Sequence, residues 1–239
     1  MRLIAEQLAT LRAQIRAAEE RAGRPPESCA LLAVSKGVSA ERVAEAIDAG
    51  QCHFGENRVQ ELEEKRAAVA LLRPGAETYW ELIGPLQSNK LRRALAVADR
   101  IISIDRMDLL TKLIGASNDA PGVTSIALQV NSDEDPAKAG FAPAALRDAL
   151  PDVATLLRGT NVVIDGLMMI GRLTDDQAAA RRSVAAFASY ATSIRASAAD
   201  AGLHVGPLLS AGMSGDFEVA VEEGSTQVRL GSALFGARG

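Results

Sequence analysis

Short apolar runs alternate with longer amphipathic segments along most of the chain. Each run is a few residues long, is apolar throughout or nearly so, and is bounded by glycine, proline or small polar residues, a pattern that predicts buried strands. The predicted strands are Ala30–Val34, His53–Gly55, Tyr79–Ile83, Arg100–Ile104, Ser125–Val130, Val162–Met169, Val205–Ser210 and Gln227–Leu230.

The segments between these runs carry apolar residues at helical spacing. In the first segment Ile4, Leu8, Leu11 and Ile15 recur at that spacing, and Ser39 is a good N-cap for the helix that follows the first strand. The remaining predicted helices are Arg58–Leu71, Asn89–Ala98, Met107–Ile114, one from Pro143, Asp175–Ala201, Phe217–Glu223 and a short one from Ser232.

Eight strands that alternate with helices predict parallel βα units. Eight such units in about 250 residues is the usual size of a closed (β/α)8 barrel. An open doubly wound sheet would show a glycine-rich dinucleotide turn after the first strand, and Ser35-Lys36-Gly37-Val38 is not one. No linker-like stretch divides the chain, so we expect a single TIM-barrel domain over residues 1–239.

Composition and charge exclude several classes of function. A net charge of -4 gives no electrostatic reason to bind nucleic acid or an anionic membrane, and no stretch approaches the roughly 20 apolar residues of a membrane span. Cys29 and Cys52 do not have metal-site spacing, and two free cysteines suit a reducing compartment. We therefore expect a cytoplasmic protein without a metal site.

Lys36 closes the first predicted strand and is followed at once by a turn. A lysine at that position has its stem in apolar surroundings and its amine facing a cleft, and burial there lowers its pKa. A neutral amine is what Schiff-base chemistry with an aldehyde needs. A solvated lysine at a strand terminus is the competing interpretation. Lysine is scarce in this chain, which weighs against random surface charge; the lysines are Lys36, Lys65, Lys90, Lys112 and Lys138.

Two loops of small residues follow the seventh and eighth strands. The first is Ser210-Ala211-Gly212-Met213-Ser214-Gly215, and the second is Leu230-Gly231-Ser232. Backbone N–H groups and serine hydroxyls in such loops bind phosphate, and loops at these two strands are the usual phosphate site of a TIM barrel. Either loop alone is explained by a tight turn, whereas the two together favour a phosphate site.

Arg229 lies immediately before the second loop. It is either a structural arginine paired with a carboxylate or a fixed cation that donates to the ring nitrogen of a heterocycle. In the second case the ring nitrogen stays unprotonated, which limits carbanion chemistry. An aldehyde-reactive lysine, a phosphate site and a ring-nitrogen partner together suggest pyridoxal 5′-phosphate (PLP). A barrel for another phosphorylated metabolite, with Lys36 as a plain charge, stays open.

Motifs spread along nearly the whole chain resemble those of the pyridoxal phosphate homeostasis proteins. The matching segments are Ala33-Val34-Ser35-Lys36, Phe54-Gly55-Glu56-Asn57 with Val59-Gln60-Glu61, Ile83-Gly84-Pro85-Leu86-Gln87-Ser88-Asn89-Lys90, Ile104-Asp105-Arg106, Asn131 through Gly140, Gly166-Leu167-Met168, Gly212-Met213-Ser214 with Asp216, Gly224-Ser225-Thr226 through Val228-Arg229-Leu230-Gly231, and Leu234-Phe235-Gly236-Ala237-Arg238.

The resemblance implies a barrel similar to the N-terminal domain of alanine racemase, usually monomeric, that holds PLP as a lysine aldimine. It implies that Lys36 is the Schiff-base lysine and Arg229 the ring-nitrogen partner. By the same resemblance Asn57 lines the pocket, and the phosphate is held by Ser210, Gly231 and Ser232.

The family is regarded as lacking a firm catalytic activity. The resemblance therefore implies a protein that buffers PLP or delivers it to PLP-dependent apoenzymes. The alternative is a PLP-dependent amino-acid racemase or lyase. Related racemases take an opposing base from a second domain of a partner subunit; we expect no room for that domain in 239 residues and see no Tyr or Cys placed as the base.

Five positions depart from the common pattern of the family. Gly37 stands where Thr is frequent, Arg58 where Tyr is usual, and Glu81 where His is usual. Gly171 belongs to a turn that normally contains Pro, and Ser232 replaces Thr but keeps the hydroxyl. Arg58 and Glu81 are expected to alter the charge near the pocket.

Overall fold

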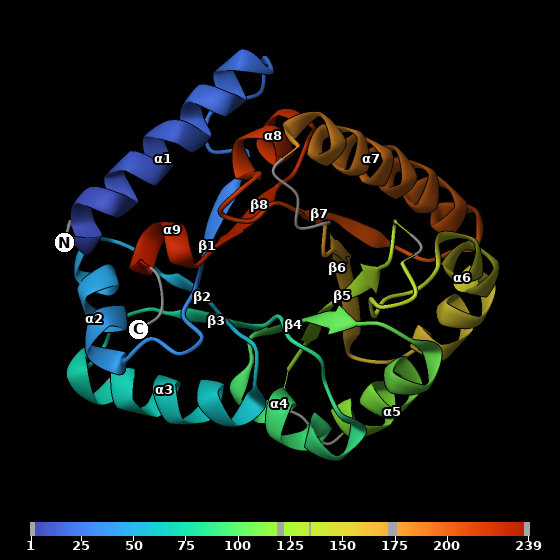
Figure 1. The fold of residues 1–239 in the computed structure, drawn as a ribbon. Coiled ribbons are helices and arrows are strands. Elements are labelled where there is room, and N and C mark those ends of the chain that lie inside the picture. The colour runs from blue at the N-terminus through green and yellow to red at the C-terminus, as the bar shows by residue number, and fades with distance from the viewer. Residues whose placement is uncertain (1–2, 119–121, 134, 172–175, 237–239) are drawn as a thin grey trace.

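Eight parallel strands form a closed barrel in the computed structural model, which describes residues 3–118, 122–133, 135–171 and 176–236 (Figure 1). Each strand pairs with its sequence neighbours, and β8 pairs with β1 to close the sheet. The predicted (β/α)8 fold is confirmed. The strands are β1 (Ala30–Val34), β2 (His53–Glu56), β3 (Tyr79–Leu82), β4 (Arg100–Ile104), β5 (Thr124–Val130), β6 (Val162–Met169), β7 (Val205–Ser210) and β8 (Gln227–Leu230).

Helices follow every strand and surround the barrel. They are α1 (Ile4–Arg21), α2 (Ala40–Asp48), α3 (Val59–Leu72), η1 (Ser88–Lys90), α4 (Leu91–Val97), α5 (Met107–Ser117), α6 (Pro143–Leu157), α7 (Gln177–Asp200), α8 (Phe217–Glu222) and α9 (Ser232–Phe235). Within the described part of the chain, no helix is both long and apolar enough to cross a membrane.

The strand predictions agree with the structure to within one residue at either end. The helix predictions differ more at their ends. The segment predicted as one helix over residues 89–98 begins as the 3-10 turn η1, and the helix predicted to end at Ile114 continues to Ser117. The predicted helix start at Asp175 lies outside the described residues, and α7 is capped by Asp176, whose carboxylate accepts from the N–H of Ala178.

The first helix occupies the place of an eighth barrel helix. Only the short α9 follows β8, and α1, although it precedes β1 in the chain, packs between α8 and α2 and also contacts α9 (Figure 1). Ile4, Leu8, Leu11 and Ile15 are the buried face of α1, as their spacing predicts. The helical ring is therefore closed on the side where β1 meets β8, which is the side that carries Lys36.

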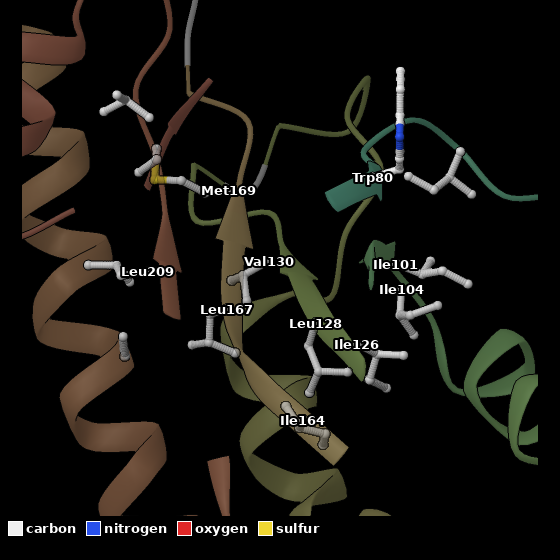
Figure 2. Packing of buried hydrophobic residues seen from close by; sticks show 14 of the residues in the cluster. Trp80, Ile101, Ile104, Ile126, Leu128, Val130, Ile164, Leu167, Met169 and Leu209 are labelled. Atoms are coloured by element: carbon white, nitrogen blue, oxygen red, sulfur yellow. The ribbon is translucent and has the colours of Figure 1, made fainter. Parts of the chain in front are cut away.

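Alternate strand residues face opposite sides of the barrel wall, because successive side chains of a strand point in opposite directions. The outward residues pack against the helices in one large core, of which Figure 2 shows Leu128, Ile164 and Leu167. A smaller cluster is made by Ile102, Ala127 and Met168, with Ile83 and Leu208 packed against it.

Candidate functional site

Lys36 lies in the turn that follows β1, at the end of the barrel where the strands terminate. Val34 and Ser35 are buried, and the N–H of Val38 donates to the carbonyl of Ser35 at 2.9 Å to close the turn. Gly37 has a φ of 69°, a backbone conformation that glycine adopts without the strain that a side chain would bring. The Lys36 side chain is half-buried.

A cavity of about 400 Å³ opens beside this turn, at the ends of β1 and β8. Five of the eight residues predicted to bind the cofactor line it: Lys36, Ser214, Arg229, Gly231 and Ser232. The rest of the wall consists of Val34, Val38, Ile83, Met213, Gly215, Phe235 and Gly236. The structure thus brings the predicted amine, the predicted cation and two predicted hydroxyls to one space.

Arg229 is a buried cation held by oxygen atoms of the neighbouring strands. Its Nη1 donates to the carbonyl and the hydroxyl of Ser210, each at 2.8 Å, and its Nη2 donates to the carbonyl of Met169 at 2.7 Å. Burial lowers the pKa of Arg229 to about 10, although the nearby carboxylates of Asp216 and Glu81 act in the opposite direction. The guanidinium therefore stays protonated at neutral pH in a fixed orientation.

The two loops of small residues lie side by side at the cavity. Gly212 has a φ of 95°, and a Cβ at this position would lie 2.5 Å from the Cβ of Ala220, so only glycine fits. Its carbonyl accepts from the N–H of Arg229 at 3.0 Å. The hydroxyl of Ser214 accepts from the N–H of Ala233 at 3.2 Å, which ties the loop after β7 to the start of α9.

Ser210, which the resemblance implies as a phosphate ligand, lies at the end of β7. It is fully buried and is not part of the cavity wall. Its hydroxyl donates to Oε1 of Gln227 at 2.7 Å and accepts from Arg229 at 2.8 Å. Because Ser210 is the last residue of β7 and faces the inside of the barrel, it lies beneath Arg229 and supports it.

Asn57 lines a neighbouring cavity instead of the one that contains Lys36. That second cavity, of about 500 Å³, also contacts Arg58, Gln60, Gln87 and Lys90. The backbone of Asn57 is covered by the loop after β3, where a Cβ on Gly84 would lie 2.2 Å from the Asn57 carbonyl oxygen. Asn57 is not part of the wall of the Lys36 cavity, and its role in holding the cofactor stays a prediction.

The barrel interior next to Arg229 is polar. Nε2 of Gln227 donates to Oε1 of Glu81 at 2.7 Å, and Nη1 of Arg100 lies 3.3 Å from the same oxygen. The other oxygen, Oε2 of Glu81, is buried without a hydrogen-bond partner among the described residues. Burial raises the pKa of Glu81 to about 7, against the opposing effects of Arg100 and Gln227.

Two further departures from the family pattern, Arg58 and Gly171, do not line the Lys36 cavity. Arg58 is exposed and contributes to the cavity of Asn57. Gly171 lines a third cavity, together with Asp133 and Asp216. Arg58 and Glu81 are the two departures expected to change the charge near the pocket. Among the described side chains, only Glu81 is connected to the Lys36 cavity by hydrogen bonds, which run through Gln227 and Ser210 to Arg229.

Comparisons with known proteins show the family and the fold of this chain. The model of the family "Alanine racemase, N-terminal domain" matches residues 7–239. The pyridoxal phosphate homeostasis protein of Escherichia coli (strain K12) is 40% identical over 98% of this chain and 97% of its own length. That of Pseudomonas aeruginosa is 39% identical over 100% of this chain and 97% of its own length.

The chain belongs to the pyridoxal phosphate homeostasis protein family. PipY of Synechococcus elongatus, solved both without and with PLP bound, is 39% identical and has a TM-score of 0.84 over 98% of this chain and 100% of its own chain. The alanine racemase of Streptomyces lavendulae is 21% identical, with a TM-score of 0.72 over 96% of this chain and 57% of its own, and shares the fold.

Membership of the pyridoxal phosphate homeostasis protein family confirms the resemblance drawn from the motifs. Sequence reasoning did not assign several residues of the cavity wall to the site. Phe235 and Gly236 lie in the C-terminal motif, and Met213 lies in the loop after β7. The motifs that contain these residues could therefore have indicated that they belong to the site. Gln227 lies within the matching segment from Gly224 to Gly231, but no pattern in the sequence indicated its hydrogen bond with Glu81, because both residues lie within strands.

Proposed function

We propose that the protein binds PLP through a Schiff base to Lys36 and buffers it or delivers it to PLP-dependent apoenzymes, without being an enzyme itself. The observation that carries this proposal is the convergence of Lys36, Arg229, Ser214 and Ser232 on one cavity of about 400 Å³. The solved complex of PipY with PLP, at 39% identity, supports the same ligand for this chain.

The amine of Lys36 supplies the covalent bond. In its neutral form it attacks the aldehyde carbon of PLP, a C–N double bond forms, and the aldehyde oxygen leaves as water with the two amine protons. Lys36 lines the cavity together with apolar residues such as Val34 and Val38. A reversible bond of this kind suits a protein that stores an aldehyde and releases it.

The two small-residue loops supply the phosphate site. Ser214 and Ser232 bring hydroxyl groups to the cavity, and Gly231 lets the backbone approach a ligand without a side chain in the way. Charged phosphate oxygens accept strong hydrogen bonds from hydroxyl and backbone N–H donors. In this proposal Ser210 holds Arg229 in place, and the phosphate contacts come from the residues of the cavity wall.

Arg229 favours holding PLP over using it for catalysis. The guanidinium is protonated at neutral pH and can only donate, so a ring nitrogen beside it stays unprotonated and withdraws electrons weakly. In the part of the chain that the structure describes, the cavity wall contains no Tyr, His or Cys that could act as an opposing base. Both features weigh against a racemase or lyase.

Three measurements on the purified protein test this function. Addition of PLP is expected to produce the absorbance of a protonated imine in wild type and not in Lys36→Ala. The loaded protein is expected to reactivate a PLP-dependent apoenzyme, in the presence of a phosphatase that destroys free PLP. Complete racemisation of an amino acid at a steady rate would contradict the proposed function, and a failure to transfer PLP to any apoenzyme would contradict delivery and leave buffering alone.

A further inference from the structure

A buried ion cluster lies directly behind the turn that carries Lys36. The Nζ of Lys65 on α3 donates to the carbonyl of Ser35 at 2.5 Å, to Oε1 of Glu56 at 2.5 Å and to Oε1 of Glu61 at 2.9 Å. The side chains of Lys65 and Glu56 are 7% and 0% exposed. Lys65 is therefore a buried lysine of α3 whose amine reaches the ends of β1 and β2, and it does not line the cavity.

The same cluster also binds the backbone that follows Lys36. Oε1 of Glu61 accepts from the N–H of Gly37 at 2.5 Å. The Ser35 carbonyl belongs to the peptide bond before Lys36, and the Gly37 N–H belongs to the peptide bond after it. Lys65 and Glu61 thus hold both peptide groups that flank the Cα of Lys36, and they contact each other.

The charges of the cluster are unequal, with one cation between two carboxyl groups. Burial raises the pKa of Glu56, while Lys65 and Ser35 act against this rise through their hydrogen bonds. Partial burial also acts to raise the pKa of Glu61, but hydrogen bonds from Gly37 and Lys65 outweigh it and the pKa is lowered. Glu61 is therefore a carboxylate at neutral pH, and its negative charge strengthens its hydrogen bond with the Gly37 N–H.

A buried ion cluster is costly, which calls for a reason beyond stability. Taking Lys65 and Glu56 out of water carries a desolvation penalty that apolar residues of similar volume would avoid. Oε2 of Glu56 has no hydrogen-bond partner among the residues that the structure describes, so the cluster does not satisfy all of its own polar atoms. The cluster does provide two hydrogen bonds to the backbone, one on each side of Lys36.

We infer that Lys65 and Glu61 are positioning residues that fix the backbone of Lys36 so that its amine meets the aldehyde of PLP in a reactive geometry; this inference rests on the proposed function. The Lys36 side chain has several rotatable bonds and stands next to a glycine, so a firmly held turn narrows the range of positions that its amine can take. Holding a reacting group in place lowers the entropic part of the barrier.

Variants of Glu61 test the inference, because this side chain is the more accessible member of the cluster. Glu61→Ala removes the acceptor for the Gly37 N–H, and we expect the rate of imine formation at saturating PLP to fall by about tenfold or more, in the range that small misplacements produce. Glu61→Gln keeps an acceptor oxygen, and we expect it to restore most of the rate. Glu63→Ala, on the same helix and in an exposed ion pair with Arg93, is the matched control.

Two measurements without PLP separate this inference from the proposed function. Amide exchange at Gly37 is expected to accelerate in Glu61→Ala. Reductive methylation with formaldehyde is expected to modify Lys36 at a different rate in that variant from wild type. Lys65→Met is expected to show the same changes more strongly, and Lys65→Arg to restore part of them; if the Met variant fails to fold, the Glu61 series decides.

The outcomes are distinguishable. A wild-type protein that forms no imine on Lys36 would overturn the proposed function, and with it the role of the cluster in that reaction. A wild-type imine together with an unchanged rate and unchanged Gly37 exchange in Glu61→Ala would overturn the positioning role alone. Equal losses in Glu61→Gln and Glu61→Ala with unchanged Gly37 exchange would also contradict it, because they would show that charge and not the backbone contact matters.

Discussion

Nε2 of Gln227 donates to Oε1 of Glu81 at 2.7 Å inside the barrel, between β8 and β3. Oε1 of the same Gln227 amide accepts from Ser210 at 2.7 Å, and Ser210 accepts from Arg229 at 2.8 Å. A carboxyl group in the barrel core is therefore connected to the cation in the cavity wall through two intervening side chains. Glu81 also acts on Arg229 through its charge, which raises the pKa of Arg229 against the larger effect of burial.

The first prediction concerns the pH dependence of stability. Burial raises the pKa of Glu81 from 4.5 to about 7, so the folded protein binds this proton more tightly than the unfolded chain does. The tighter binding of this proton stabilises the folded protein fully below pH ~4.5, and that stabilisation is lost as the pH rises through about 7. Since a shift of one pKa unit corresponds to about 1.4 kcal/mol, the free energy of unfolding loses about 3 kcal/mol over that interval through this group.

Glu81→Gln removes this proton-binding group and keeps an amide oxygen that can accept from Gln227. As the pH rises from ~4.5 to ~8, we expect the free energy of unfolding of the variant, measured relative to that of wild type, to increase by about 3 kcal/mol. Urea denaturation of both proteins at several pH values measures this difference. Parallel pH dependences for the two proteins would show that Glu81 titrates normally.

A second prediction concerns Ser210, which supports Arg229. Ser210→Ala leaves Oε1 of Gln227 without its donor and removes one acceptor of Arg229, so we expect a loss of about 1–3 kcal/mol in the free energy of unfolding. The affinity for PLP is expected to fall as well, because the guanidinium is held less firmly. Fluorescence titration with PLP measures the second effect.

Ser103 provides the matched control for that experiment. It is a buried serine of β4 whose hydroxyl has no hydrogen-bond partner in the described part of the structure. Ser103→Ala removes an unsatisfied polar group, so the free energy of unfolding is expected to stay the same or rise. If Ser210→Ala behaves like Ser103→Ala in both measurements, Ser210 does not support Arg229.

The third prediction concerns the glycine that shapes the loop after β7. Gly212→Ala places a methyl group 2.5 Å from the Cβ of Ala220 in a backbone conformation with a φ of 95°. Strain and overpacking together are expected to cost about 2–4 kcal/mol of the free energy of unfolding. Gly215→Ala meets no atom within 4 Å and is expected to have little effect on stability. Equal stabilities of the two variants in thermal denaturation would contradict the loop geometry.

The fourth prediction separates the chemistry of Lys36 from the fold. Lys36 is half-buried at the end of the barrel, so Lys36→Ala is expected to change the free energy of unfolding by no more than about 0.5 kcal/mol. The same variant is expected to lose the imine absorbance completely. If circular dichroism shows that the variant does not fold, then Lys36 has a structural role that the present account does not include.

The fold was predictable because local patterns along the chain agree with one another. Apolar runs such as Ala30–Val34 and Val162–Met169 have the length of buried strands, and glycine or proline residues end them. The order of strands in a barrel follows the order in the sequence, so the ends of the strands meet at one mouth. Lys36 and Arg229 could therefore be placed together without any knowledge of their side-chain contacts.

The remaining details depend on which side of the wall a residue faces. Ser210 and Ser214 belong to one small-residue loop in the sequence, yet the first points into the barrel core and only the second reaches the cavity. The partnership of Gln227 with Glu81 spans the barrel and joins residues 146 positions apart. Such contacts are set by the register of the closed sheet, which no local pattern in the chain records.

Reduction of the PLP-loaded protein with borohydride, followed by mass mapping of its peptides, tests the central claim most directly. Borohydride converts an imine into a stable amine and so marks the lysine that carried it. The account predicts one pyridoxyl adduct on the peptide that contains Lys36 and none on the peptide that contains the buried Lys65. An adduct confined to another lysine, or no adduct at all, would contradict the assignment of Lys36 as the residue that binds PLP.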